Sequence, residues 1–179
     1  MRAGVVVFAV GNRSRGDDAI GPLLLERLAG ALAAQARAAE FALVEDYQLQ
    51  IEHALDLQGR RLALFIDAGL RTREPVEFRA AMPEWAARDT HMLTPQSVLD
   101  VYRRTALSQP PPAFTLCVRG DRFELGEGLS STAQARLEQA WQLLERLCRR
   151  PDTAYWLDMA GRGNDAQCPA CDAPLARNA

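Results

Sequence analysis

The stretch "VVVFAVGNRSRGDDAIGPLLLERL", residues 5–28, decides the fold class of this chain. It opens with a continuous apolar run that is typical of a strand buried on both faces. A Gly-Asn turn follows, and from Ile20 onward apolar residues recur at helical spacing, with two acids at the helix start. A strand that leads directly into a helix is the building unit of α/β folds with a parallel sheet.

The rest of the chain repeats this alternation of strand and helix patterns. Further strands are predicted at residues 41–47, 61–69, 74–83 (near a sheet edge) and 113–120, and further helices at residues 49–57, 94–107 and 131–150. The alternation predicts a three-layer α/β/α sandwich around a mostly parallel sheet. We assign residues 1–150 to a single domain and residues 151–179, which are rich in Gly, Pro, Asn and Asp, to a tail.

Composition limits the possible functions. A chain of 179 residues with 48% hydrophobic content suits one well-buried domain. The formal net charge of −2 gives no electrostatic footprint for nucleic acid, and no apolar run is long enough to span a membrane. The N-terminal run from Ala3 to Val10 loosely imitates a signal peptide, but the turn and helix that follow favour a first buried strand. We therefore expect a cytoplasmic protein whose four cysteines stay reduced.

Candidate functional residues gather where predicted strands end. In parallel α/β sheets ligands bind beyond the carboxyl ends of the strands, and Asp17, Asp18 and Asp67 all lie at such ends. One acid of the pair can cap the helix, and neighbouring helical residues point about 100° apart, so their roles should differ. We assign Asp17 to structural orientation and Asp18 to the cleft. For Asp67, an Asx cap of its own turn and a functional role both stay open.

His91 lies in a loop just ahead of a predicted helix and completes a possible metal site. Two carboxylates and an imidazole at one sheet edge resemble an open metal site, and imidazole suits nickel, zinc or copper. A phosphate loop is disfavoured because "GNRSRGDD" lacks the Lys-Ser/Thr ending and its paired acids would repel phosphate. "CPAC", with Cys168 and Cys171, lacks two further ligands in reach and is interpreted as an accessory feature of the tail.

Four motifs together resemble a known family. "VVVFAVGNRSRGDDAIGPLLLERL", "LFIDAG", "THMLTP" and "LCVRGDRFELGEGLS", in this order, are similar to the hydrogenase maturation proteases, endopeptidases that act on nickel-iron hydrogenase large subunits. The resemblance runs from about Val5 to Arg150. It implies an α/β/α fold with a twisted five-stranded sheet. It also implies removal of a short C-terminal extension from the large-subunit precursor, the expected partner, after nickel has been inserted.

The resemblance also implies roles for single residues. By matching motifs, the nickel-contacting and catalytic residues would be Asp18, Asp67 and His91, and the orienting residues would be Gly11, Asn12, Asp17 and Gly21. No permanent metal is implied, because the nickel arrives with the substrate. Two mechanisms stay open: the metal polarises the scissile carbonyl or a water, or one of the two carboxylates activates the water as a base.

The chain departs from the family pattern in two places. "EDYQLQIEHALDL", residues 45–57, stands where many members carry Gly-Gly-Thr, so we interpret it as a mark of a particular client, with Gln50 and His53 as possible substrate contacts. Taken alone, His53 is more typical of a surface or packing histidine. The spacer "RSR", residues 13–15, is more cationic than usual and is expected to line the cleft.

Two other functions compete with the protease. One is a non-proteolytic nickel-sensing module that checks hydrogenase assembly, and the other is a metallohydrolase with its own zinc. Chain length, the ordered motifs and the lack of thiolate ligands in the core favour the protease.

Overall fold

The computed structural model describes residues 3–70, 72, 74–84, 93–106 and 108–161. Its five-stranded sheet has the order β2-β1-β3-β5-β4, in which only β4 runs antiparallel to its neighbour. The strands are β1 (Val5–Val10), β2 (Phe41–Asp46), β3 (Leu62–Gly69), β4 (Val76–Ala81) and β5 (Ala113–Arg119). The helices are η1 (Gly16–Ala19), α1 (Ile20–Ala34), η2 (Ala38–Glu40), α2 (His53–Asp56), α3 (Pro95–Thr105), α4 (Ser131–Arg149) and α5 (Thr153–Gly161).

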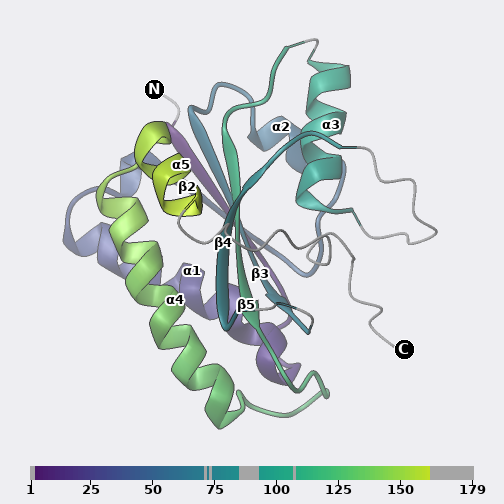
Figure 1. Cartoon of the computed structure of the whole chain (residues 1–179), viewed down its shortest axis with the longest axis vertical. Helices are drawn as coiled ribbons and strands as arrows, with labels where there is room; N and C mark the ends of the chain where they lie inside the picture. The colour runs from purple at the N-terminus through teal and green to yellow at the C-terminus, as the bar shows by residue number, and fades with distance from the viewer. Residues whose placement is uncertain (1–2, 71, 73, 85–92, 107, 162–179) are drawn as a thin grey trace.

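Helices cover both faces of this sheet, which confirms the predicted three-layer α/β/α architecture (Figure 1). One core contains Val5 and Val7 of β1 with side chains of α1, α4 and α5. The other core contains Val6 and Phe8 with side chains of α2 and α3. Every residue of β1 is buried. A strand covered on both faces needs apolar residues at successive positions, which explains the continuous run in the sequence.

Other local predictions are confirmed or refined by the structure. Thr94 Oγ1 accepts a hydrogen bond from Ser97 N at 3.1 Å, and Pro95 occupies the first turn, so α3 begins with the predicted cap. β4 is an edge strand, as expected from the prolines that flank it. Of the helix predicted at residues 49–57, only the four-residue helix α2 forms. Within the described residues, no helix is long and apolar enough to cross a membrane.

The predicted tail begins too early, because residues that follow Pro151 form helix α5. Asp152 Oδ1 accepts a hydrogen bond from Tyr155 N at 2.9 Å at the start of this helix. Trp156 is fully buried, and its indole N–H donates to Leu147 O at 3.0 Å. Its ring meets Phe114 edge to face with centroids 5.3 Å apart. The domain therefore extends at least to the end of α5, while Cys168 and Cys171 lie outside the described residues.

Two glycines of α1 are expected to respond in opposite ways to an added methyl group. A Cβ at Gly21 would lie 2.5 Å from Val10 O and 3.4 Å from Ile66 O, whereas nothing lies within 4 Å of a Cβ at Gly30. Gly21→Ala should lower the free energy of unfolding by about 1–3 kcal/mol, because α1 must shift away from the backbone of β1. Gly30→Ala should raise the free energy of unfolding by about 0.5–1 kcal/mol, because alanine has a higher helix propensity than glycine. Urea titration of both variants measures the two changes in the free energy of unfolding. Changes of the same sign would contradict the close contact between α1 and the sheet.

Candidate functional site

The loop between β1 and η1 is wrapped around Asp18. Gly11 has φ +146°, and a Cβ there would lie 2.0 Å from Asp18 O, so the close approach requires glycine. Asn12 N donates to Asp18 Oδ2 at 3.0 Å, and Asn12 Oδ1 accepts from Ser14 N at 2.9 Å. Asp18 is 1% exposed. The Gly-Asn pair of the motif therefore fixes both the backbone and the carboxylate of Asp18.

Asp17 faces a different partner, the connection between β5 and α4. Its Oδ2 accepts from Asp121 N at 2.8 Å and from Arg122 N at 3.0 Å. Ser130 donates its backbone N–H to Oδ1 at 2.7 Å and its hydroxyl to Oδ2 at 2.9 Å. Burial opposes ionisation of this carboxyl, but these hydrogen bonds, led by that from Ser130, outweigh it and hold the pKa of Asp17 below its ordinary value.

The expectation that one of the two acids caps the first helix is wrong. The N-cap residues of η1 and α1 are Arg15 and Ala19, and neither makes a side-chain capping hydrogen bond. The chain enters α1 through the short helix η1, so both acids lie within a turn and their carboxylates reach partners outside the helix. Asp17 holds the β5–α4 connection, and Asp18 holds the loop that follows β1.

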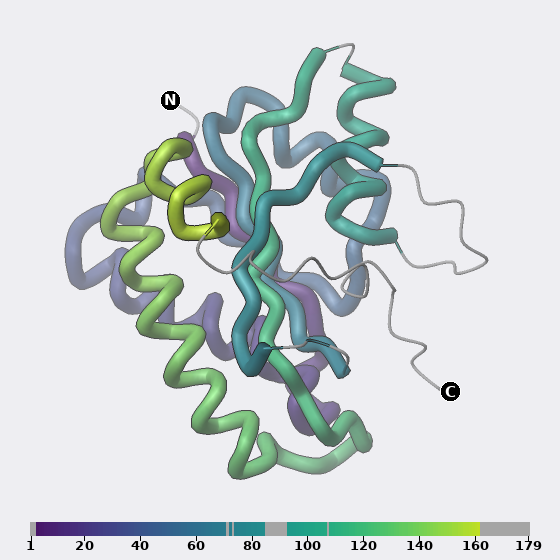
Figure 2. The backbone as a smooth tube through the Cα atoms, viewed as in Figure 1, coloured from purple at the N-terminus to yellow at the C-terminus, as the bar shows by residue number. Residues whose placement is uncertain are grey.

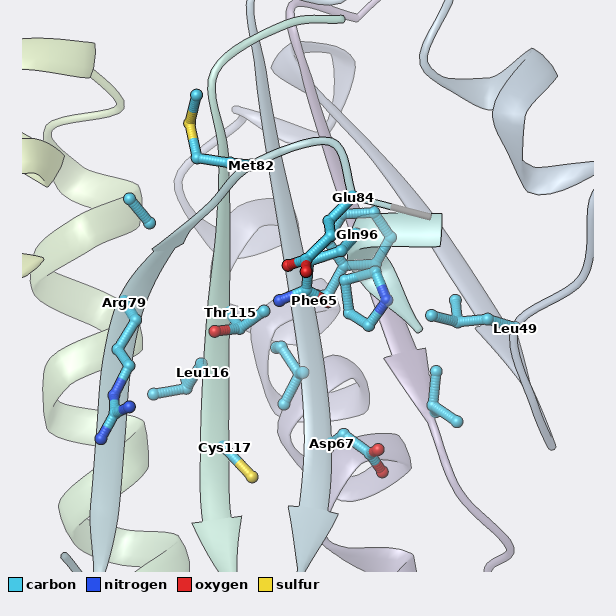
Figure 3. A pocket seen from close by; sticks show the side chains of 14 residues that line it. Leu49, Phe65, Asp67, Arg79, Met82, Glu84, Gln96, Thr115, Leu116 and Cys117 are labelled. Atoms are coloured by element: carbon cyan, nitrogen blue, oxygen red, sulfur yellow. The ribbon is translucent and has the colours of Figure 1, made fainter. Parts of the chain in front are cut away.

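Asp67 lies near the carboxyl end of β3 and lines a cavity of about 290 Å³ (Figure 3). Its Oδ1 accepts from Ala68 N at 2.8 Å, and its side chain is half-buried. The cavity is lined by Val10, Leu49, Phe65, Ile66, Asp67, Arg79, Ala80, Met82, Glu84, Pro95, Gln96, Thr115, Leu116 and Cys117. Figure 3 shows Asp67 and Cys117 at one end of this cavity, on neighbouring strands that pair at these two residues. The wall is mostly apolar with a few polar groups, as in binding pockets generally.

The structure brings Asp18 and Asp67 to neighbouring elements at the same edge of the sheet. Helix η1, which carries Asp18, contacts β3, which carries Asp67. His91 lies outside the described residues, so its position relative to the two carboxylates stays a prediction. Among the described residues, no group of three or more His, Cys, Asp or Glu side chains is arranged to hold a metal ion.

The side chains of Gln50 and His53 both contact a third acid, Asp46, at the carboxyl end of β2. His53 Nε2 lies 3.5 Å from Asp46 Oδ2, and Gln50 Nε2 donates to the same oxygen at 3.3 Å. Gln50 N donates to His53 Nδ1 at 3.0 Å, so that nitrogen carries no proton in this arrangement. His53 is 8% exposed and packs its ring edge to face against Phe8. Of the two, Gln50 has the exposed side chain and His53 supports the turn.

Two further residues of this region, Asp46 and Cys117, were not predicted from the sequence. Asp46 ends the run "FALVED" in the same way that Asp67 ends "LALFID", so the rule that selected Asp67 could have found it. Cys117 has no such signal, because it lies inside a strand and only its pairing with Asp67 brings it to the cavity.

The arginines of the "RSR" spacer make structural contacts. Arg13 pairs with Glu45 on β2 at 2.8 Å and with Glu26 on α1. Arg15 Nε donates to Phe123 O at 3.2 Å. Neither side chain lines the cavity that contains Asp67, so the expectation that the spacer lines the cleft does not hold for that cavity.

Solved structures with the same fold include several hydrogenase maturation proteases. The [NiFe] hydrogenase maturation protease HycI from Thermococcus kodakarensis KOD1 is 22% identical with a TM-score of 0.61, covering 83% of this chain and 94% of that chain. The hydrogenase maturating endopeptidase HybD from Escherichia coli is 24% identical with a TM-score of 0.60, covering 83% and 93%. A hydrogenase 2 maturation peptidase from Thaumarchaeota archaeon SCGC_AB-539-E09 is 17% identical with a TM-score of 0.56, covering 83% and 98%.

Comparisons with protein-family models and with curated proteins find no match to this chain. At these levels of identity, the similarity to the solved structures shows a common fold. The chain thus has the α/β/α fold of the hydrogenase maturation endopeptidases over most of its length.

Proposed function

We propose that this protein is a cytoplasmic endopeptidase that removes the C-terminal extension of a nickel-iron hydrogenase large-subunit precursor after nickel insertion. The observation that carries the proposal is the site at the sheet edge. There the Gly11–Asn12 loop holds Asp18 on η1, and η1 contacts the strand whose Asp67 lines the cavity. The common fold with solved enzymes named for this activity supports the same reading.

In this proposal the substrate's own nickel is contacted by Asp18, Asp67 and His91. Two carboxylates and an imidazole without a thiolate should bind nickel only weakly. We therefore expect the protein to retain no resident metal, and the nickel to arrive with the substrate. The bound nickel would orient the scissile region beside the cavity and polarise its carbonyl or a water. The cavity is near the lower limit of ligand pockets, which suits a short peptide segment.

Asp67 is the better-placed base if a carboxylate activates the water. Its half-buried side chain lines the cavity, whereas Asp18 is 1% exposed and accepts a backbone hydrogen bond from Asn12. A general base must come within hydrogen-bond reach of the attacking water, which favours the group that faces open space. Asp18 then serves as a fixed contact for the metal.

We assign client recognition to the turn after β2. Gln50 is exposed there and would contact the substrate directly, while the buried ring of His53 holds the turn through Gln50 N and Asp46. His53 is thus a positioning residue for the contact made by Gln50.

Incubation with the hydrogenase large-subunit precursors of its genome, with and without nickel loaded, tests the function by intact mass. We expect loss of a C-terminal peptide from the nickel-loaded form only. Nickel-dependent binding without mass loss would instead support the checking module. Stoichiometric zinc in the purified protein, with hydrolysis that needs no hydrogenase subunit, would support the metallohydrolase.

A further inference from the structure

Large hydrophobic side chains are exposed at the edge of the sheet that carries Asp18 and Asp67. We call this set the edge hydrophobics. Its members and their exposed fractions are Tyr47 (65%), Ile51 (57%), Leu70 (45%) and Leu125 (75%). All of them lie on connections that leave the carboxyl ends of parallel strands: β2, β3 and β5. They come from three separate connections, and they are rimmed by polar residues beside the candidate site, as is typical of surfaces that bind a partner protein.

The strand order places these side chains on both sides of the two carboxylates. The sheet runs β2-β1-β3-β5, Asp18 follows β1, and Asp67 lies on β3. Tyr47 leaves β2 on one side of this pair of strands, and Leu125 follows β5 on the other. A partner that reaches the carboxylates from this edge therefore meets apolar side chains on either flank.

The connection that carries Leu125 is fastened to the loop that carries Asp18. Gly126 N donates to Ser14 O at 2.7 Å, and Gly16 N donates to Glu127 O at 3.0 Å. The Asp17 carboxylate adds its hydrogen bonds from the same connection. Figure 2 shows this connection beside the start of α1 at the lower end of the molecule. The backbone beside Leu125 is thus held in place relative to the site, so little backbone entropy is lost there when a partner binds.

Some charged residues near Leu125 form ion pairs within the protein, whereas its neighbour Glu124 is an exposed carboxylate. Arg122 and Glu127 lie 3.7 Å apart, and Asp121 pairs with Arg136 at 2.7 Å. Leu125 is thus an exposed apolar side chain surrounded by charged residues, an arrangement like the apolar centre and polar rim of protein–protein interfaces.

We propose that the edge hydrophobics dock an apolar patch on the folded body of the protein substrate and so deliver its C-terminal extension to the cavity. This inference rests on the proposed function. A cavity of about 290 Å³ can hold only a short segment of chain, far less than the surface that specific protein complexes bury. Asp67 lies at this edge and lines the cavity, so a second copy of this chain seated here would compete with the substrate for access to Asp67. The body of the substrate is therefore the occupant that fits.

The test replaces single edge hydrophobics and measures steady-state processing of the full-length nickel-loaded precursor. Leu125→Ser and Tyr47→Ser should each raise KM about fivefold to tenfold and leave kcat unchanged, because exposed interface anchors contribute to binding and not to the chemical step. The matched control is Leu157→Ser on α5, an equally apolar residue that is 51% exposed and lies away from this edge. Its KM should stay within about twofold of the wild type. Thermal unfolding of all three variants should match that of the wild type.

Each other outcome overturns a defined part of the proposal. If the wild type processes the precursor and the edge variants have an unchanged KM, docking at this surface is wrong and the proposed function stands. If the wild type processes no precursor in either nickel state, the proposed function fails and the docking with it. If the wild type is a dimer that Leu125→Ser dissociates, the surface binds a second copy and not the substrate.

Discussion

Asp17→Ala is expected to lower the free energy of unfolding by about 3–5 kcal/mol, since the two buried donors of Ser130 are left without an acceptor and the bonds from Asp121 and Arg122 are also lost. The wild-type carboxylate accepts backbone hydrogen bonds from Asp121, Arg122 and Ser130 and one from the Ser130 hydroxyl. The side chain is 0% exposed, and the two bonds from Ser130 are buried, so bulk water does not reach the Ser130 donors in the folded protein. Chemical denaturation gives the change directly. The matched control is Glu124→Gln, which replaces an exposed carboxylate on the same connection. It should alter the free energy of unfolding by less than about 0.5 kcal/mol.

The stabilising effect of Asp17 should depend on pH in a defined direction. Hydrogen bonds in the folded protein hold the pKa of Asp17 below its ordinary value, although burial acts in the opposite direction. The contribution of this group is therefore fully present above its unfolded pKa of about 3.9 and is lost as pH falls through the lower folded pKa. The difference in stability between the wild type and Asp17→Asn should narrow below about pH 4. A difference that is constant with pH would show that the charge of Asp17 does not contribute.

Asp18→Asn and Asp67→Asn are each expected to reduce precursor processing at least about 100-fold while the protein stays folded. Asparagine keeps the shape of both side chains, and its carbonyl oxygen can still accept from Asn12 N at position 18 or from Ala68 N at position 67. What it removes is the negative charge that contacts nickel or activates water. Intact-mass assays on the nickel-loaded precursor measure the loss.

Two comparisons make the result specific. Asp158→Asn removes an exposed carboxylate from α5, away from this edge of the sheet, and should process the precursor at the wild-type rate. Nickel-dependent binding of the precursor should weaken in Asp18→Asn, whereas Asp67→Asn should retain more of it if Asp67 is the base. Full processing by either variant would exclude that residue from the site.

The fold could be predicted from the sequence because the hydrophobic pattern of each segment reflects how that segment is buried. β1 and β3 lie in the middle of a sheet covered on both faces, so their runs are apolar throughout. The helix that ends in Arg149 and the cap at Thr94 are also local features. Helix α5 was missed because it is short and follows a proline. What secures it is the burial of Trp156 against Phe78 and Phe114, which lie far from it in the sequence.

The sequence by itself determined the α/β architecture and the gathering of Asp18 and Asp67 at one sheet edge, because parallel strands bring their carboxyl ends together. It also predicted that adjacent acids at a helix start would point apart. Only the tertiary structure decided what each acid holds. The donors to Asp17 are more than 100 residues away, with separations of 104 to Asp121 and 113 to Ser130. Long-range hydrogen bonds and burial arise when distant segments pack together, so no local pattern contains them.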